Sequence, residues 1–384
     1  MAAAPAESSP ARTPSSYAEA GVDTAAGDLA VELMKASVKA THGAEVLGGV
    51  GGFAGLFDAS ALVGMKRPLL ATSTDGVGTK VAIAQAMDVH DTIGYDLVGM
   101  VVDDLVVCGA EPLFMTDYIA TGKVFPERIA EIVRGIAEAC ALTGTALVGG
   151  ETAEHPGLLG QNDYDVAGAA TGVVEADRVL GAERVRAGDA VIALASSGIH
   201  SNGFSLVRHI ITRAGISYGD QAADFGVTWG EALLEPTRLY TTPLLDLVAK
   251  LGADVHSLTH VTGGGIAANL ARVLPVGTWV DVDRSTWTPS AVFRVLSDIA
   301  GTTLESSEGT WNLGIGFMAV VSADKASEAI AQIRSAGISA WQVGVVRDGA
   351  LPETGEAFEQ GAKGVDGGAV RLVSTYAESA SGRL

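Results

Sequence analysis

The chain is short of cysteine, of aromatic residues and of positive charge. Its 384 residues include 2 cysteines, and aromatic side chains make up 5% of the total. Cys108 and Cys140 lie in apolar stretches without metal-ligand spacing, so they predict neither a disulfide framework nor a cysteine-bound metal. With so few aromatic residues, the cores must be built mainly from Val, Leu, Ile and Ala.

Acidic residues outnumber basic ones, 45 to 25, which gives a formal net charge of −20. Such a charge argues against sequence-independent nucleic-acid binding and against binding to an anionic membrane surface. No apolar run approaches the roughly 18 residues of a membrane span, and the Ala-, Pro- and Ser-rich start lacks the apolar region of a secretory signal. We therefore expect a cytoplasmic protein with no nucleic-acid or membrane partner.

Hydrophobic patterns divide the chain into two halves that each mix helices with strands. Residues 1–16 are expected to be disordered, 17–174 to form an N-terminal domain, 175–349 a C-terminal domain, and 350–384 a tail with a possible strand at 369–373. The helices expected from periodicity and turn residues include 23–41, 91–108, 236–251 and 323–336. The expected strands include 69–74, 113–120, 146–148, 164–174, 190–195, 317–321 and 340–346.

Acidic side chains recur beside glycine-rich turns in the first half. Asp75 ends a strand and precedes Gly76 and Gly78, and Glu151 follows two glycines in the same way. Asp96 and Asp103 are seven positions apart, which places both on one face of a largely apolar helix. Acids on such a helix need a cation or hydrogen-bond donors. The other acids in this region are Asp104, Asp117 and Glu154. Such a group is typical of a magnesium–nucleotide site, because carboxylates hold the cation and bare N–H groups hold phosphates.

Two common nucleotide-binding motifs are excluded. Residues 49–54 fit the pattern G-x-G-x-x-A, but a helix and polar loop precede them and no long helix follows, so a dinucleotide-binding fold is not predicted. Residues 76–80 lack the spacing of a phosphate-binding P-loop. A nucleotide must therefore be held in another way.

Long collinear stretches of the chain resemble one enzyme family, phosphoribosylformylglycinamidine cyclo-ligase, also called aminoimidazole ribonucleotide synthetase. The matching stretches are 16–23, 48–55, 74–80, 103–107, 109–114, 120–123, 149–154, 197–203 and 262–265. Asp103 departs from the family pattern, in which asparagine is expected, and His155 stands where methionine is usual. The Asp103 difference puts a metal role for that residue in doubt.

The resemblance implies an α+β fold of two domains, with an N-terminal sheet that forms a barrel across a homodimer and a C-terminal α/β sandwich. It implies ATP-dependent ring closure of formylglycinamidine ribonucleotide to aminoimidazole ribonucleotide, giving ADP and phosphate through a phosphorylated amide. The alternatives are another ATP-using member of the superfamily and a catalytically inactive nucleotide-binding regulator. Selenophosphate synthetase would need a reactive cysteine near its start, which this chain lacks.

The same resemblance implies the roles of individual residues. Asp75, Asp96 and Glu151 would hold Mg²⁺, and the glycine-rich loop would wrap the triphosphate of ATP. His200 lies inside a strand-to-helix glycine loop, which makes it the candidate general acid or base; the alternative is that it stabilises the loop or contacts a substrate phosphate. Asp75 and Lys35 would join His200 in catalysis, and Lys35 and Lys80 are candidate phosphate partners. The further binding residues are Gly49, Gly51, Gly52, Phe53, Gly76, Gly78, Thr79, Ser201, Asn202, Gly263 and Gly264.

Overall fold

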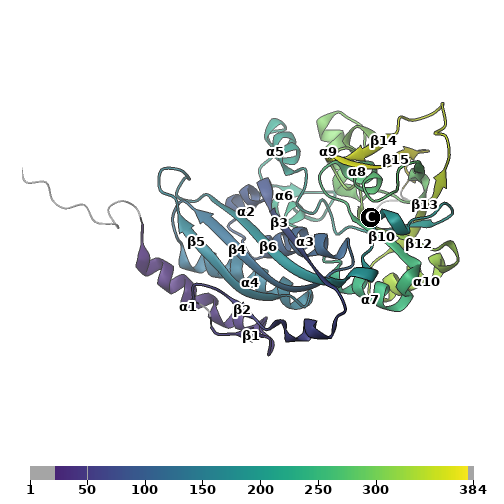
Figure 1. The fold of residues 1–384 in the computed structure, drawn as a ribbon. Coiled ribbons are helices and arrows are strands. Elements are labelled where there is room, and N and C mark those ends of the chain that lie inside the picture. The colour runs from purple at the N-terminus through teal and green to yellow at the C-terminus, as the bar shows by residue number, and fades with distance from the viewer. Residues whose placement is uncertain (1–21, 50, 379–384) are drawn as a thin grey trace, which may run out of the picture.

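The computed structural model describes residues 22–49 and 51–378, so the expected disordered stretch 1–16 lies outside the described part. Two sheets of different size, each with its own helices, make up the two halves of the molecule (Figure 1). None of the helices in the described residues is long and apolar enough to cross a membrane.

The first half is built on a four-stranded sheet with the order β3-β6-β4-β5. β4 runs parallel to β5 and antiparallel to β6, which is antiparallel to β3. The strands are β3 (Pro68–Gly76), β4 (Glu111–Thr121), β5 (Ala146–Glu154) and β6 (Tyr164–Glu175). Short β1 (Val46–Leu47) pairs with β2 (Leu56–Phe57) beside this sheet.

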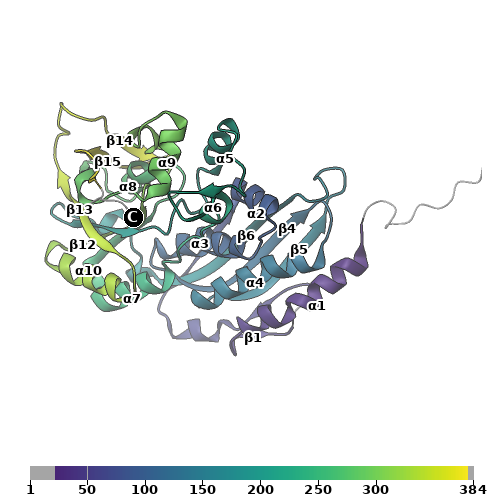
Figure 2. The same ribbon diagram turned by 180° about the vertical axis from the view of Figure 1, so that it is seen from behind.

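Helices cover one face of this sheet and leave the other bare. α3 (Thr92–Val106) and α4 (Pro126–Leu142) lie on the sheet, α1 (Thr24–Ala40) packs outside α4, and α2 (Val81–Met87) follows β3 (Figure 2). Alternation along β4 explains the two faces, because Met115 and Ile119 are buried while Tyr118 is 43% exposed. The bare face also carries Leu70, which is 66% exposed.

Two strands of this half are longer than the sequence predicts. β3 continues through Gly76 and β5 continues to Glu154, so Asp75 and Glu151 lie within strands instead of just after them. Turn residues misled the prediction, because Gly149 and Gly150 are paired with β4 rather than ending β5.

The second half is a seven-stranded mixed sheet with the order β10-β12-β7-β13-β11-β15-β14. Its strands are β7 (Ala190–Ala195), β10 (Val255–His260), β11 (Thr278–Asp283), β12 (Ile315–Val321), β13 (Ala340–Asp348), β14 (Glu359–Ala362) and β15 (Val365–Val373). Its helices are α5 (Phe204–Arg213), α6 (Trp229–Leu233), α7 (Thr241–Leu251), α8 (Gly265–Ala271), α9 (Ala291–Ala300) and α10 (Ala326–Ser335), with a small β8 (Gln221–Ala222) and β9 (Val227–Thr228) hairpin.

The C-terminal segment is part of this sheet. β15 pairs in parallel with β11, and Arg371 on β15 donates from Nε to the Asp281 carboxylate on β11, at 2.6 Å. The buried guanidinium of Arg284 donates to the carbonyl oxygens of Leu372 and Ser374. These contacts tie the residues expected to form a tail into the core of the second half.

One predicted helix starts later than expected. α7 begins at Thr241, whereas Pro236 was expected to open it at 236. The segment 235–240 instead runs along α3, where two buried acids hold it, as described next.

Candidate active site

Asp96 is a fully buried acid on α3 that forms an ion pair with Lys80. The Lys80 Nζ lies 2.8 Å from each carboxylate oxygen of Asp96 and donates to the Glu235 carbonyl oxygen at 2.7 Å. Oδ1 of Asp96 also accepts from the backbone N–H and the hydroxyl of Thr237, at 2.9 and 2.6 Å. Burial works against both charges, since it raises the pKa of Asp96 and lowers the pKa of Lys80.

These contacts correct two expectations. Asp96 was predicted to hold a metal and Lys80 to bind phosphate, but in this structure each neutralises the other away from solvent. The pair connects the first half to the 235–240 segment of the second half. Its physical role is therefore to fix how the two halves meet.

Asp103, two helical turns further along α3, holds the same segment. Its carboxylate accepts from the Tyr240 backbone N–H at 3.0 and 3.1 Å and from the Thr241 hydroxyl at 2.6 Å. It therefore caps the start of α7 from another helix. Burial raises the pKa of Asp103 to about 6, against the lowering effects of His260 and these donors.

His200 lies inside the second half and does not face a cleft. Its side chain is 2% exposed, its backbone has a φ of 67°, and its Nε2 accepts from the Ser197 N–H at 3.2 Å. Burial holds the pKa of His200 well below its usual value. A ring with so low a pKa is a weak base, which argues against the predicted role of His200 as general acid or base, and its contact with the Ser197 N–H stabilises the 197–203 loop.

Asp75, Asp104 and His260 instead lie near one another where the two halves meet. Nδ1 of His260 lies 2.9 Å from Oδ1 of Asp104, and its ring stacks on Phe317 with centroids 5.2 Å apart. Asp75 keeps an exposed face, yet partial burial raises its pKa, and the charge of nearby Asp104 adds to this effect. Nε2 of His260 is buried and has no hydrogen-bond partner among the described residues.

A cavity of about 180 Å³ adjoins this group. Thr262 and Arg272 line it from the second half, and Val365, the first residue of β15, closes one side. The Nη1 of Arg272 donates to Asn269 at 3.3 Å, while its Nε has no partner in the described part of the chain. The cavity thus offers an acid, an imidazole nitrogen and a guanidinium to a bound molecule.

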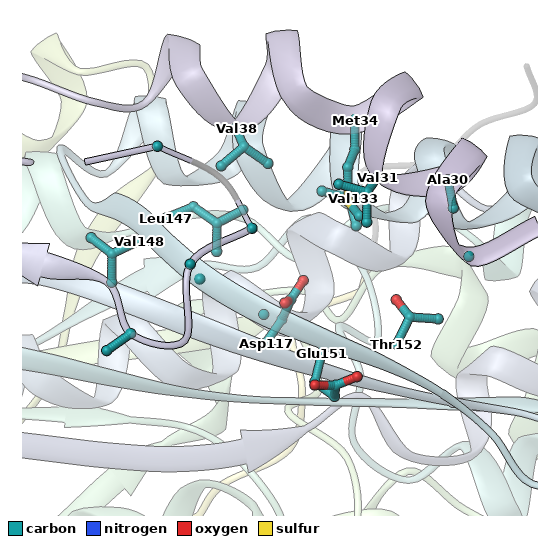
Figure 3. A pocket seen from close by; sticks show the side chains of 17 residues that line it. Ala30, Val31, Met34, Val38, Asp117, Val133, Leu147, Val148, Glu151 and Thr152 are labelled. Carbon is teal, nitrogen blue, oxygen red and sulfur yellow. The ribbon is translucent and has the colours of Figure 1, made fainter. Parts of the chain in front are cut away.

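A second cavity, of about 350 Å³, lies between α1, β5 and the glycine-rich loop (Figure 3). Gly49, Gly51 and Gly52 of the loop line it, as does Glu151. Lys35 lies in the adjoining hollow beside Gly48 and pairs with Glu32 on the surface of α1. Phe53 is fully exposed.

The remaining predicted residues fall into two groups around α3 and α5. Asn202 donates to the sulfur of Met100 at 3.2 Å and lies against Gly263, so the loops 197–203 and 262–265 meet. Ser201 is buried beside it. Further along, Thr79 Oγ1 is 3.1 Å from the Ser205 hydroxyl. The glycines with a positive φ at these turns are Gly78 and Gly264, and Gly76 ends β3.

The structure does not assemble the predicted metal set. Within the described residues, no three His, Cys, Asp or Glu side chains gather in a way that could hold an ion. Of the predicted ligands, Asp96 is committed to Lys80, and Asp75 and Glu151 lie on β3 and β5 at opposite edges of the sheet. Magnesium needs fewer protein ligands than that, since it keeps several waters and often takes one or two carboxylates with substrate phosphates.

Sequence reasoning missed His260 and Arg272. His260 ends β10 just before the glycines at 263–265, which is the same kind of strand-to-helix turn that drew attention to His200. That shared position was a usable signal. The partner of His260, Asp104, is 156 residues away in the chain, so only the folded structure could reveal the pair.

Comparisons with known proteins agree with this arrangement. Residues 57–174 match the N-terminal domain and residues 186–353 the C-terminal domain of the family described as AIR synthase related protein. The phosphoribosylformylglycinamidine cyclo-ligase of Sorangium cellulosum is 49% identical over 340 residues, covering 88% of this chain and 97% of that protein. The one from Rippkaea orientalis is 46% identical over 334 residues, covering 87% and 96%.

Solved structures show the same fold at low identity. A thiamine-monophosphate kinase from Stenotrophomonas maltophilia superimposes with a TM-score of 0.63 at 18% identity, covering 88% of this chain and 95% of that chain. E. coli HypE, a hydrogenase maturation protein, gives a TM-score of 0.60 at 17% identity, covering 89% and 98%. From the two domain matches and the extent of identity to the enzymes above, the chain belongs to the phosphoribosylformylglycinamidine cyclo-ligase family.

Proposed function

We propose that this chain closes the imidazole ring of aminoimidazole ribonucleotide from formylglycinamidine ribonucleotide, with conversion of ATP to ADP and phosphate. The observation that carries the proposal is the group formed by Asp75, Asp104 and His260 where the two halves meet. It combines carboxylates suited to a cation–phosphate complex with an imidazole nitrogen that can take a proton. The names of the curated relatives support the choice of substrate.

ATP would bind along the glycine-rich loop, with its γ-phosphate directed across the sheet toward Asp75 and Asp104. The loop glycines present backbone N–H groups without side chains in the way, and Lys35 supplies a nearby positive charge. A HypE protein of the same fold has been solved in complex with ATP, with a TM-score of 0.52. This supports a nucleotide site in the fold but does not define its contacts in this chain.

Asp75 and Asp104 are the residues that fit Mg²⁺. Both carry exposed carboxylates where the halves meet, and their charges act on each other, which a shared cation would relieve. When bound, the cation would neutralise phosphate charge during transfer. This assignment replaces Asp96 with Asp104 and gives Glu151, across the sheet, no part in holding the ion.

Two bond exchanges make up the reaction. The amide oxygen of the substrate takes the γ-phosphoryl group of ATP, and the bond to ADP breaks. An internal nitrogen then attacks the carbon that carries this oxygen, the carbon–oxygen bond breaks, and phosphate leaves. Because the attack is intramolecular, orientation in the site lowers its barrier.

His260 is placed to remove the proton that ring closure releases from the attacking nitrogen. With Nδ1–H donating to the Asp104 carboxylate, the tautomer leaves a lone pair on Nε2. The Phe317 ring and the buried position hold the imidazole in one orientation. Asp104 thus orients the base, and Arg272 offers a charge for a substrate anion.

The bare face of the first sheet supports a homodimer through residues 17–174. Leu70 and Tyr118 stand 66% and 43% exposed on a face that no helix in the described residues covers. A second copy of this sheet would bury these side chains and close a barrel. Light scattering at micromolar concentration should give twice the chain mass of 39.0 kDa, and a monomer would refute this part.

The function is tested by product analysis with purified protein. Formylglycinamidine ribonucleotide and ATP should give aminoimidazole ribonucleotide and ADP in equal amounts. His260→Gln should slow both products together, while Asp246→Asn on the exposed side of α7 should leave the rate unchanged. Release of ADP without the ring product would contradict the proposed reaction.

A further inference from the structure

Asp117 lies on the floor of the larger cavity, in the middle of a sheet. On β4 it pairs with Gly150 of β5 on one side and with Gly168 of β6 on the other. Its side chain is on the helix-covered face, which it shares with the buried Met115 and Ile119. An acid at such a position is costly unless a partner compensates it.

Among the described residues, the Asp117 carboxyl accepts a hydrogen bond from its own backbone N–H and from no other group. Space for it is provided by Gly150, since a Cβ there would lie 1.7 Å from Oδ1 of Asp117. Burial raises the pKa of Asp117 to about 7. The carboxyl is therefore partly protonated at neutral pH, with room made for it and, in the described part of the chain, no partner beyond its own backbone.

The walls above this carboxyl are apolar and its rim is rich in glycine. Figure 3 shows the Asp117 oxygens pointing toward Met34, Val31 and Val133, and Glu151 lower and away from those side chains. The glycine-rich loop runs along the same cavity. The cavity measures about 350 Å³, and Glu151 and Thr152 line it together with Asp117. A slot with apolar side chains above and a few polar groups at its base is the form of site that a flat heteroaromatic ring fills.

We propose that Asp117 recognises the purine base of ATP by accepting a hydrogen bond from its 6-amino group and donating one to the ring nitrogen N1. The inference rests on the proposed function, because it assigns the base of the nucleotide whose phosphates the glycine-rich loop would hold. A neutral carboxyl has one acceptor and one donor side by side, which matches this edge of adenine. The apolar side chains of α1 and α4 would cover the faces of the ring.

A cation is a poorer occupant of this cavity. Apolar side chains of α1 and α4 face Asp117, and no group of three acids or histidines that could hold an ion occurs among the described residues. A bound cation would also require the ionised carboxylate, whose formation burial opposes. A neutral base with its own donor and acceptor satisfies the carboxyl without that cost.

The test compares binding of ATP with binding of purine riboside triphosphate, which lacks the 6-amino group, by titration calorimetry. Wild-type protein should bind ATP roughly tenfold or more tightly, the worth of one buried hydrogen bond. Asp117→Leu, similar in size but without a polar group, should bind both nucleotides equally. Thr116→Val, one residue away on the opposite face of β4, should keep the wild-type preference.

Gly150→Ala provides a second variant in which the carboxyl is present but displaced. The added methyl group meets Oδ1 of Asp117 and must push it aside, so the preference for ATP should fall as it does in Asp117→Leu. A melting curve for each variant separates this result from loss of fold.

The possible outcomes distinguish a failure of adenine recognition by Asp117 from a failure of the proposed cyclo-ligase function. If Asp117→Leu retains the full preference for ATP, the base is read elsewhere and the inference is wrong, whereas the cyclo-ligase activity of the wild type is untouched. If wild-type protein binds neither nucleotide and makes no product from ATP, the proposed function itself fails.

Discussion

Burial of Asp103 should make the stability of this protein depend on pH in a way that one substitution removes. The usual pKa of the group is 3.8, and burial raises it to about 6 in the folded chain. Folding therefore favours the protonated form of Asp103. The stabilisation that this gives the folded state is fully present below pH 3.8 and is lost as the pH rises through about 6. At about 1.4 kcal/mol per pH unit, the complete loss is on the order of 3 kcal/mol.

Asp103→Asn keeps a carbonyl oxygen for the Tyr240 N–H and the Thr241 hydroxyl but cannot ionise. Between pH 5 and 8, the free energy of unfolding of the wild type should fall by about 1.4 kcal/mol relative to the variant. Urea unfolding at matched ionic strength over this range measures the difference. Asp246→Asn, at an exposed site on α7, is the control and should show no such trend. A wild-type-minus-Asn difference that stays constant with pH would refute the claim that burying this charge is costly.

Four further results are expected from the same contacts. Asp96→Ala strands the buried charge of Lys80 and should lower the free energy of unfolding by about 3–5 kcal/mol, measured in urea, whereas a lost metal ligand alone would leave stability unchanged. His200→Asn should keep the wild-type pH–rate profile, since the ring is neutral and buried; a shifted profile would restore it as acid or base. His260→Gln should lower kcat by roughly 10²–10⁴-fold with little change in ATP affinity, and an increase in KM alone would reduce it to a binding residue. Ending the chain at residue 353 removes β14 and β15 and should lower the melting temperature sharply, while ending it at 378 should not.

Composition and periodicity predicted the two mixed halves and most of their elements. The alternation in β4 and the apolar face of α4 are local patterns, so no long-range information was needed to identify them. The lengths of β3 and β5 were underestimated, because glycines that read as turns are instead paired in the sheet. Likewise, Pro236 did not open α7, since the preceding segment is held extended by acids from another helix.

The site was harder to predict because its groups are brought together by the fold. Asp96 and Asp103 were correctly placed on one buried helix face that needs partners, but those partners are donors from the second half and not a cation. His200 and His260 occupy similar turns in the sequence and both are buried, but His260 pairs with the Asp104 carboxylate and lines a cavity, whereas His200 accepts from a backbone N–H of its own loop. The position of Asp117 between two glycines depends on strand register, which a single sequence does not reveal.

The most direct test of the account is a turnover measurement with wild-type protein, formylglycinamidine ribonucleotide, ATP and Mg²⁺. We predict one aminoimidazole ribonucleotide and one phosphate for each ADP, with 18O from the substrate amide recovered in the phosphate because that oxygen accepts the γ-phosphoryl group. Formation of the ring product without ATP consumption, or phosphate free of the amide oxygen, would contradict the mechanism.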